Sequence, residues 1–309
     1  MSIIEKAAGK LSAPPARAET EPQARESLIE GAVRRSRETP TASAPPVVDP
    51  ATIWGALPEA EGQARSQIQQ VNMTRLSHMG YITPENEKGQ AAEEFRIIKR
   101  PLIANAFGLG TARVKNGNLI MVTSALPGEG KSYCAINLAI SMAMEMERTV
   151  LLVDADVARP RVPEYLGLQA DRGLLDVLRD KDLQLSDLLI RTDIAKLTVL
   201  PAGRTYKRAT ELLASSAMTQ LVEDIGNRYP DRIIVFDSPP LLATSEASVL
   251  ASHMGQIVLV VESERTPQEA VREAINHIQS CEVVGLLLNK ATPTVGSDYY
   301  YGYYGSYGK

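Results

Sequence analysis

Six short apolar runs recur over the last two thirds of the chain, and helix-like stretches separate several of them. The runs cover residues 119–123, 150–153, 197–200, 233–236, 257–261 and 283–288, and helices are expected at 132–147, 211–228 and 267–280. A strand that is apolar throughout leaves no face for water, which is typical of a parallel sheet covered by helices on both sides. The pattern predicts an α/β domain with a doubly wound, mostly parallel sheet over residues 90–291.

The two ends of the chain differ from this central domain in composition. Residues 1–89 hold nine of the 19 prolines, and they can bury too little apolar surface to offset the entropy of ordering. They are predicted to form a largely disordered leader with short helices near 26–37 and 61–79. A helix should then start at Gln90, and Pro101 should kink or split it. Residues 292–309 lack periodicity, contain six of the 11 tyrosines, and are expected to form a flexible tail.

Charge, cysteine content and hydropathy exclude several classes of protein. The 33 basic and 37 acidic residues give a net charge of −4, so no nucleic-acid partner is expected. Cys134 and Cys281 are too few and too far apart for a disulfide framework or a four-ligand zinc site, which favours a reducing, cytoplasmic compartment. We find no signal-peptide pattern and no apolar run of about 20 residues, so we expect a soluble chain and leave peripheral membrane association open.

A glycine-rich segment follows the first predicted strand and leads into a predicted helix. It reads SALPGEGKS over residues 124–132 and matches the phosphate-binding pattern GxxxxGK[ST], except that Ala125 replaces the first glycine. Such a loop turns backbone N–H groups toward phosphate oxygens, while Lys131 can reach the β- and γ-phosphates and Ser132 can ligate Mg²⁺. We interpret it as a nucleotide site rather than an ordinary turn. The predicted binding residues are Gly128, Glu129, Gly130, Lys131, Ser132 and Tyr133.

Three aspartates close two of the other predicted strands. Asp154 and Asp156 follow the run 150–153, and Asp237 follows the run 233–236. The carboxyl ends of parallel strands meet where such sheets bind ligands, and strand alternation would point Asp154 and Asp156 the same way. A strand-end cap explains any one aspartate, but three of them beside a phosphate loop favour a Mg²⁺ site.

The carboxylates also indicate what reaction the site performs. A tyrosine hydroxyl has a pKa of ~10 and attacks a phosphate more readily beside a base. Either Asp154 or Asp156 could be that base while the other serves the metal, and the spacing does not decide between them. The tail supplies candidate nucleophiles, although a low-complexity end is the simpler interpretation of it. These candidates are Tyr299, Tyr300, Tyr301, Tyr303, Tyr304 and Tyr307.

Together these segments resemble one family, the bacterial protein-tyrosine autokinases (BY-kinases) of exopolysaccharide synthesis. The resemblance covers residues 90–309 and rests on ALPGEGKS at 125–132, LLVDADVARP at 151–160, FDSPP at 236–240 and the tyrosine-rich end. The segment EEFRIIK at 93–99 resembles the family's ExxRxxR helix, which is used in ring formation. Within the family, the chain most resembles the free-standing kinases of exosortase (PEP-CTERM) loci.

The resemblance implies an activity and a set of residue roles. The activity would be ATP-dependent phosphorylation of the tail tyrosines, in trans within an oligomer, which would regulate exopolysaccharide polymerisation and export. Lys131 and Ser132 would hold ATP and Mg²⁺, and Asn289 would contact adenine. Asp154 would be the base that activates the tyrosine. The catalytic residues would be Lys131, Asp154 and Asp156, and the metal ligands would be Ser132, Asp156 and Asp237.

The resemblance also implies partners and a location. The chain would assemble with itself into a ring, a membrane polysaccharide chain-length determinant would activate it, and a cognate tyrosine phosphatase would act on it. It would be cytoplasmic and peripherally associated with the inner membrane through its partner. Three positions depart from the family pattern: Ala158 and Lys99 stand where arginines are usual, and Glu246 stands where aspartate is usual. Lys99 lacks the bidentate fork of arginine, so ring contacts would be weaker.

Two other functions stay open from the sequence. A switch ATPase of the septum-positioning or chromosome-partitioning kind shares the phosphate loop. Such proteins usually carry a signature lysine where this chain has Leu126, and they lack a six-tyrosine tail. A scaffold of a polysaccharide complex, in which nucleotide only sets the oligomeric state, would need no kinase chemistry.

Overall fold

The computed structural model describes residues 68–108, 113–180 and 182–292. Among these residues, no helix is both long and apolar enough to cross a lipid bilayer.

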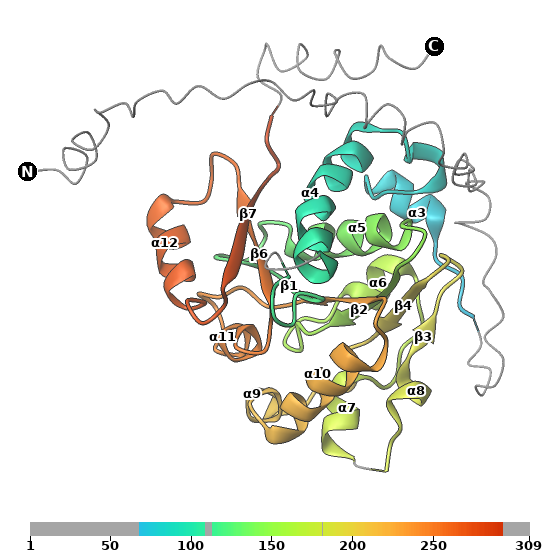
Figure 1. Ribbon diagram of the computed structural model, residues 1–309, viewed down its shortest axis with the longest axis vertical. Helices are drawn as coiled ribbons and strands as arrows, with labels where there is room; N and C mark the ends of the chain where they lie inside the picture. The colour runs from blue at the N-terminus through green and yellow to red at the C-terminus, as the bar shows by residue number, and fades with distance from the viewer. Residues whose placement is uncertain (1–67, 109–112, 181, 293–309) are drawn as a thin grey trace, which may run out of the picture. The chain divides into compact units, whose positions relative to one another are not determined.

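A seven-stranded sheet in the order β3-β4-β2-β5-β1-β6-β7 forms the centre of the described part (Figure 1). Its strands are β1 (Leu119–Ser124), β2 (Thr149–Asp154), β3 (Ile190–Arg191), β4 (Leu197–Leu200), β5 (Arg232–Asp237), β6 (Gln256–Glu262) and β7 (Val283–Asn289). All neighbouring pairs are parallel except β3 and β4, which are antiparallel. Each of the six predicted strands is present. Only the two-residue edge strand β3 was not expected.

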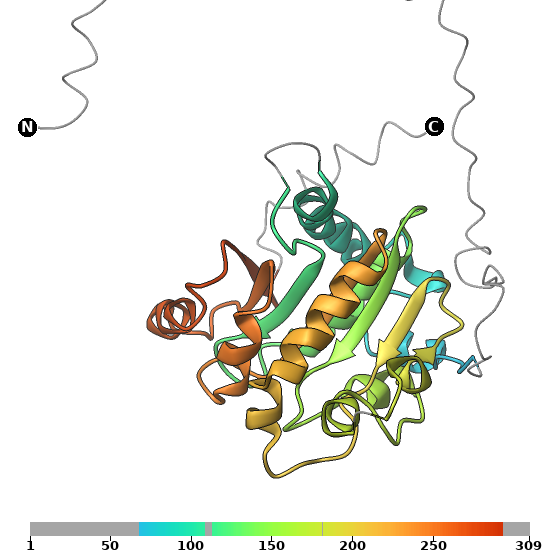
Figure 2. The same cartoon turned by 60° about the horizontal axis from the view of Figure 1, so that its bottom comes forward.

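Helices cover both faces of the sheet, as a doubly wound fold requires. One face packs on α3 (Met73–His78), α4 (Gln90–Phe107), α5 (Lys131–Ala143) and α6 (Val162–Leu166). The other packs on α7 (Leu174–Arg179), α8 (Leu185–Leu188), α9 (Ala209–Leu213), α10 (Ser216–Arg228), α11 (Glu246–Ala251) and α12 (Gln268–Asn276). Figure 2 shows α10, in orange, lying over the strands.

The central strand β1 shows why four successive residues of a strand, Leu119 to Val122, are all apolar. Ile120 and Val122 belong to the core on the α5 side, whereas Leu119 and Met121 belong to the core on the α10 side. Successive side chains point to opposite faces of a strand, and both faces are dry here. The predicted fold class, an α/β domain with a mostly parallel, doubly wound sheet, is confirmed.

Three predicted helices differ from the structure in their bounds. The helix expected at 132–147 ends at Ala143, and the one expected at 267–280 is limited to Gln268–Asn276. The stretch 211–228 is divided into α9 and α10, because the Ser215 side chain accepts the backbone N–H of Met218 and starts a new helix there.

The helix α4 continues through Pro101, so the prediction that this proline splits it is wrong. Pro101 is exposed, while Phe95, Lys99 and Leu102 are buried on the face that packs against the domain. These contacts on both sides of the proline hold the helix together despite the hydrogen bond that proline removes.

The folded domain begins well before residue 90, so the predicted leader boundary is wrong for residues 68–89. Leu76, Tyr81 and Ile82 are buried against the α4/α5 side of the sheet. Asn137 of α5 accepts the backbone N–H of Ile82 at 2.8 Å, and the Tyr133 hydroxyl donates to the Gly80 carbonyl at 2.8 Å. A few well-spaced apolar residues are enough to order this segment, which also contains the short 3-10 helix η2 (Pro84–Asn86). Residues 1–67 lie outside the described part.

The segment 93–99 contributes polar contacts between α4 and α5. Lys99 is 5% exposed; its Nζ donates to the Ser141 carbonyl at 2.6 Å and pairs with Glu145 at 2.7 Å. Glu93 and Arg96 pair with each other. Lys99 therefore joins α4 to α5.

Candidate nucleotide-binding site

The glycine-rich loop lies between the end of β1 and the start of α5, at the carboxyl end of the parallel strands. Gly128 and Gly130 have φ values of +90° and +99°, which residues other than glycine rarely adopt. A Cβ at Gly130 would also collide with Nδ2 of Asn289. The first N–H groups of α5 lack partners inside the helix, as at any helix N-terminus, so the loop and helix together form an anion site.

The three predicted aspartates meet at this loop. Asp154 ends β2 and Asp237 ends β5, and the two face each other in the strand register. Asp156 lies two residues beyond β2, so the strand-alternation argument does not apply to it, yet its Oδ2 lies 2.6 Å from Nζ of Lys131. The exposed fractions of Asp154, Asp156 and Asp237 are 0%, 4% and 0%. The structure thus groups the lysine and all three carboxylates in one buried cluster.

Hydrogen bonding distinguishes the three carboxylates. Asp156 accepts from Lys131 and from the backbone N–H of Arg159 at 3.1 Å. Asp154 accepts through Oδ2 from the backbone N–H of Val162 at 3.0 Å, but its Oδ1 has no hydrogen-bond partner in the described part. Neither oxygen of Asp237 accepts a hydrogen bond there. Three buried carboxylate oxygens therefore lack a hydrogen-bond partner among the described residues, which is costly unless a ligand completes the site.

The cluster carries more negative than positive charge, and the pKa values reflect this. Burial first, and the charge of Asp237 second, raise the pKa of Asp154 well above its usual value. Burial raises the pKa of Asp237 to about 6, against the opposing effects of Lys131 and Ser132. Burial works to lower the pKa of Lys131, but the neighbouring carboxylates, Asp237 foremost, raise it overall, so the lysine is charged at neutral pH.

A divalent cation fits this donor set. Mg²⁺ binds one or two carboxylates and completes its shell with water and phosphate oxygens. Asp237 offers two free oxygens beside Ser132, whereas Asp156 is already engaged by Lys131. Within the described residues, no group of three or more His, Cys, Asp or Glu could hold a metal ion alone. A cation here would need Ser132, water and phosphate as its other ligands.

Two other predicted binding residues, Glu129 and Tyr133, use their side chains within the protein. The Glu129 carboxylate is buried and accepts the backbone N–H of Leu126 at 2.6 Å and the hydroxyl of Thr266. Tyr133 packs against Tyr81, with ring centroids 4.9 Å apart. The Tyr133 hydroxyl donates to the Gly80 carbonyl. Both side chains therefore have partners within the protein, and these residues offer a phosphate mainly their backbone N–H groups.

Asn289, expected to contact adenine, holds the phosphate loop in this structure. It ends β7, and its Nδ2 donates to the backbone oxygen of Glu129 at 2.8 Å. The next residue, Lys290, donates to the backbone oxygen of Gly128 at 2.8 Å. Sequence reasoning did not single out Lys290 or Thr266. The only signal for Lys290 was its place directly after Asn289 at the end of a predicted strand.

The predicted acceptor tyrosines lie outside the described residues. Their assignment as phosphate acceptors therefore stays a prediction. Glu246 is one of the positions that depart from the family pattern, and the structure shows its contacts. Its Oε1 accepts the hydroxyl of Thr210 at 2.6 Å and so joins α11 to α9. It takes no part in the buried carboxylate cluster.

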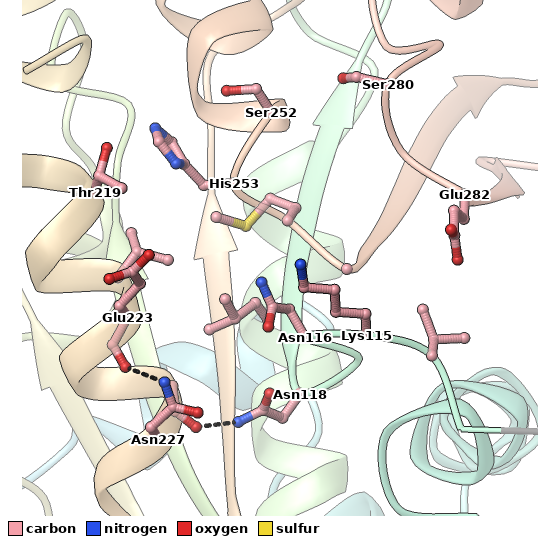
Figure 3. A pocket seen from close by; sticks show the side chains of 16 residues that line it. Lys115, Asn116, Asn118, Thr219, Glu223, Asn227, Ser252, His253, Ser280 and Glu282 are labelled. Atoms are coloured by element: carbon pink, nitrogen blue, oxygen red, sulfur yellow. Dashed lines mark hydrogen bonds between the residues drawn. The ribbon is translucent and has the colours of Figure 1, made fainter. Parts of the chain in front are cut away.

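A separate polar pocket of about 350 Å³ lies at the opposite end of the strands (Figure 3). Its lining includes Asn116 and Asn118 before β1, Glu223 on α10, and His253 before β6. Ligands of open α/β sheets bind at the carboxyl ends of the strands. This pocket lies at their amino ends and is not part of the phosphate site.

The fold and the site together define the class of the protein. A glycine-rich loop between β1 and α5, a lysine paired with a buried aspartate, and further aspartates at neighbouring strand ends are the architecture of a P-loop NTPase. Residues 115–296 match the family model ParA, described as NUBPL iron-transfer P-loop NTPase. The fold is thus a nucleotide-binding one of the ParA type.

Comparison with similar proteins shows which family of P-loop NTPases the chain belongs to. The chain is 34% identical over 227 residues to tyrosine-protein kinase YwqD of Bacillus subtilis, covering 73% of this chain and 91% of YwqD. The chain belongs to the family of bacterial tyrosine-protein kinases, as its motifs predicted. It is also 31% identical over 231 residues to EpsB of Ralstonia nicotianae, covering 72% of this chain but only 30% of EpsB. The chain thus spans less than a third of the length of that relative.

A solved structure confirms the fold independently of close sequence similarity. The kinase domain of the Escherichia coli tyrosine kinase ETK superposes with a TM-score of 0.62 at 23% identity, and the match covers 79% of this chain and 91% of that one. The likeness shows a shared architecture.

Proposed function

We propose that this chain is an ATP-dependent protein-tyrosine autokinase that converts ATP and tyrosine to ADP and phosphotyrosine. The observation that carries the proposal is the buried oxygen Oδ1 of Asp154, which lacks a partner beside the phosphate loop. A carboxylate whose pKa is raised above its usual value is a better base for a phenol, whose own pKa is ~10. The kinase family of the chain agrees with this role.

Each residue of the site would have a defined part in the transfer. The loop N–H groups and Lys131 would bind the phosphates, and Ser132 and Asp237 would bind Mg²⁺, which supplies neutralisation of phosphate charge when present. Asp156 would keep Lys131 in place. Asp154 would accept the phenol proton as the tyrosine oxygen bonds to the γ-phosphorus and the bond from that phosphorus to the ADP oxygen breaks.

The first test is phosphosite mapping. Purified protein incubated with ATP and Mg²⁺, with and without the cytoplasmic segment of a candidate membrane activator, should carry phosphate on the tail tyrosines by mass spectrometry. Lys131→Met should lose the label. Changing all six tail tyrosines to phenylalanine should also lose it while nucleotide affinity stays unchanged, and Tyr229→Phe is the matched control outside the tail. Persistent absence of phosphotyrosine in every condition would overturn the proposal.

The partners and place of action belong to the same proposal. The chain would form a ring-like oligomer, respond to a membrane polysaccharide chain-length determinant at the inner membrane, be reversed by a tyrosine phosphatase, and thereby regulate exopolysaccharide polymerisation and export. Transfer would occur in trans. Mixing a Lys131→Ala chain with an active chain that lacks its tail tests this point, because only transfer between copies can label the inactive chain.

A switch ATPase without kinase activity is the second candidate. It is favoured by the match of residues 115–296 to the ParA model. Leu126 at the position of the signature lysine weighs against it. ATP hydrolysis stimulated by a partner, with no phosphotyrosine formed, would favour the switch over the kinase.

A further inference from the structure

The carbonyl side of the phosphate loop is held by side chains that are distant in sequence. Lys290 donates to the Gly128 oxygen and Asn289 to the Glu129 oxygen, both at 2.8 Å. Thr266, in the turn after β6, donates its hydroxyl to the Glu129 carboxylate. The turn after β6 and the end of β7 therefore hold the loop by hydrogen bonds on its carbonyl side. The opposite side of the loop is left for a ligand.

These bonds determine where the loop N–H groups point. In a planar trans peptide, the C=O of one residue and the N–H of the next point in opposite directions. Holding the Gly128 oxygen toward Lys290 therefore aims the N–H of Glu129 to the other side. Holding the Glu129 oxygen toward Asn289 does the same for the N–H of Gly130. These N–H groups are the ones that cradle phosphates in such loops.

The peptide between Gly128 and Glu129 needs an external restraint. Gly128 has φ +90°, and a glycine, which has no Cβ, restricts its own ψ less than any other residue does, so the peptide that follows it can turn over more readily when nothing holds it. The Glu129 carboxylate accepts the backbone N–H of Leu126 and so closes the turn from Leu126 to Glu129. That hydrogen bond does not involve the Gly128 oxygen. In the described part, Lys290 is the side chain that holds this oxygen.

Lys290 is itself positioned at some cost. Its backbone has φ +57°, a left-handed conformation that is uncommon for a residue with a side chain. Its ammonium also pairs with Oε2 of Glu262 at 3.2 Å, and Arg265 binds the other oxygen of that carboxylate at 3.3 Å. An unfavourable backbone conformation kept in place by surrounding contacts is common at functional sites.

We infer that Lys290 is a positioning residue for the nucleotide phosphates. It holds the Gly128 carbonyl outward so that the N–H of Glu129 faces the phosphate, and it contacts the loop rather than the nucleotide. The inference rests on the proposed use of a nucleotide at this loop. It does not require that the phosphate be transferred to tyrosine.

Direct measurement of nucleotide affinity tests the inference. The dissociation constant of a fluorescent ADP analogue with Mg²⁺ should rise about three- to tenfold in Lys290→Met, the range expected for loss of one such hydrogen bond. Lys290→Arg keeps a donor and a charge and should restore most of the affinity. Arg265→Gln removes an equal charge from the same Glu262 cluster without touching the loop, and its affinity should stay within about twofold of the wild type.

Turnover and stability complete the test. If the chain phosphorylates tyrosine, Lys290→Met should raise KM for ATP and leave kcat nearly unchanged, because Lys290 orients the loop and does not touch the reacting atoms. Thermal unfolding without nucleotide identifies a variant that fails to fold, and Lys290→Gln then replaces it. Unchanged affinity in a folded Lys290 variant overturns the inference. So does an equal loss in Arg265→Gln, which would show a general effect of charge. Both outcomes are decided by binding alone, whether or not phosphotyrosine forms.

Discussion

Replacement of Asp237 by asparagine should stabilise the protein at neutral pH when nucleotide and Mg²⁺ are absent. Asp237 is fully buried at the end of β5, and neither of its oxygens has a hydrogen-bond partner in the described part. Asparagine keeps the shape of the side chain and removes its charge. The removal also relieves Asp154, because the charge of Asp237 raises the pKa of that second carboxyl.

The size of the effect follows from the pKa of Asp237. Burial raises this pKa to about 6, roughly two pH units above the value of an exposed aspartate, and each unit corresponds to about 1.4 kcal/mol. The folded chain thus binds this proton more tightly than the unfolded chain does. The stability that protonation contributes is complete below about pH 4 and is lost as the pH rises through 6, a loss of about 3 kcal/mol.

Asparagine avoids this loss but leaves a buried amide without a partner, which costs about 1–2 kcal/mol. The net gain at pH 8 should be about 1–2 kcal/mol, or roughly 2–8 °C in Tm for a domain of this size. Thermal unfolding in EDTA at pH 5, 6.5 and 8 measures it, and the advantage of Asp237→Asn should grow with pH. Asp171→Asn, at an exposed position, is the control. A difference that does not change with pH, or a less stable variant at pH 8, would refute the reasoning.

Three further changes test the loop and its supports. Gly130→Ala should weaken nucleotide binding about tenfold or more in a fluorescence titration, because Gly130 has a left-handed φ and an added Cβ would collide with Asn289. Gly80→Ala is the control, because Gly80 also has a positive φ, +77°, but an added Cβ there would meet no other atom. Glu145→Gln should cost about 1–2 kcal/mol in urea unfolding because it leaves the buried Lys99 charge unpaired, whereas Lys99→Met should cost less; the reverse order would contradict this. Asn137→Ala should speed limited proteolysis within residues 68–89, since it removes the acceptor of the Ile82 N–H; an unchanged cleavage pattern would count against it.

The strands and the phosphate loop were predictable because they depend on short-range patterns. In β1, the residues from Leu119 to Val122 alternate between two dry cores, so this apolar run alone indicated a strand buried on both faces. The loop was predictable because glycine tolerates the positive φ that the turn at Gly128 and Gly130 requires. The folded segment 68–89 was missed because its order depends on contacts with Tyr133 and Asn137, which lie about 55 residues further along the chain.

The sequence by itself determined the class of sheet, the place of the phosphate loop and the types of side chain at its edge. Only the tertiary structure decided how those side chains share their bonds. It paired Lys131 with Asp156, left Asp237 and Asp154 with free oxygens, and brought Lys290 and Asn289 to the loop carbonyls. The reason is physical: backbone conformation and periodicity are encoded locally, whereas a contact across 160 residues exists only because β6 and β7 are placed beside β1 in the sheet.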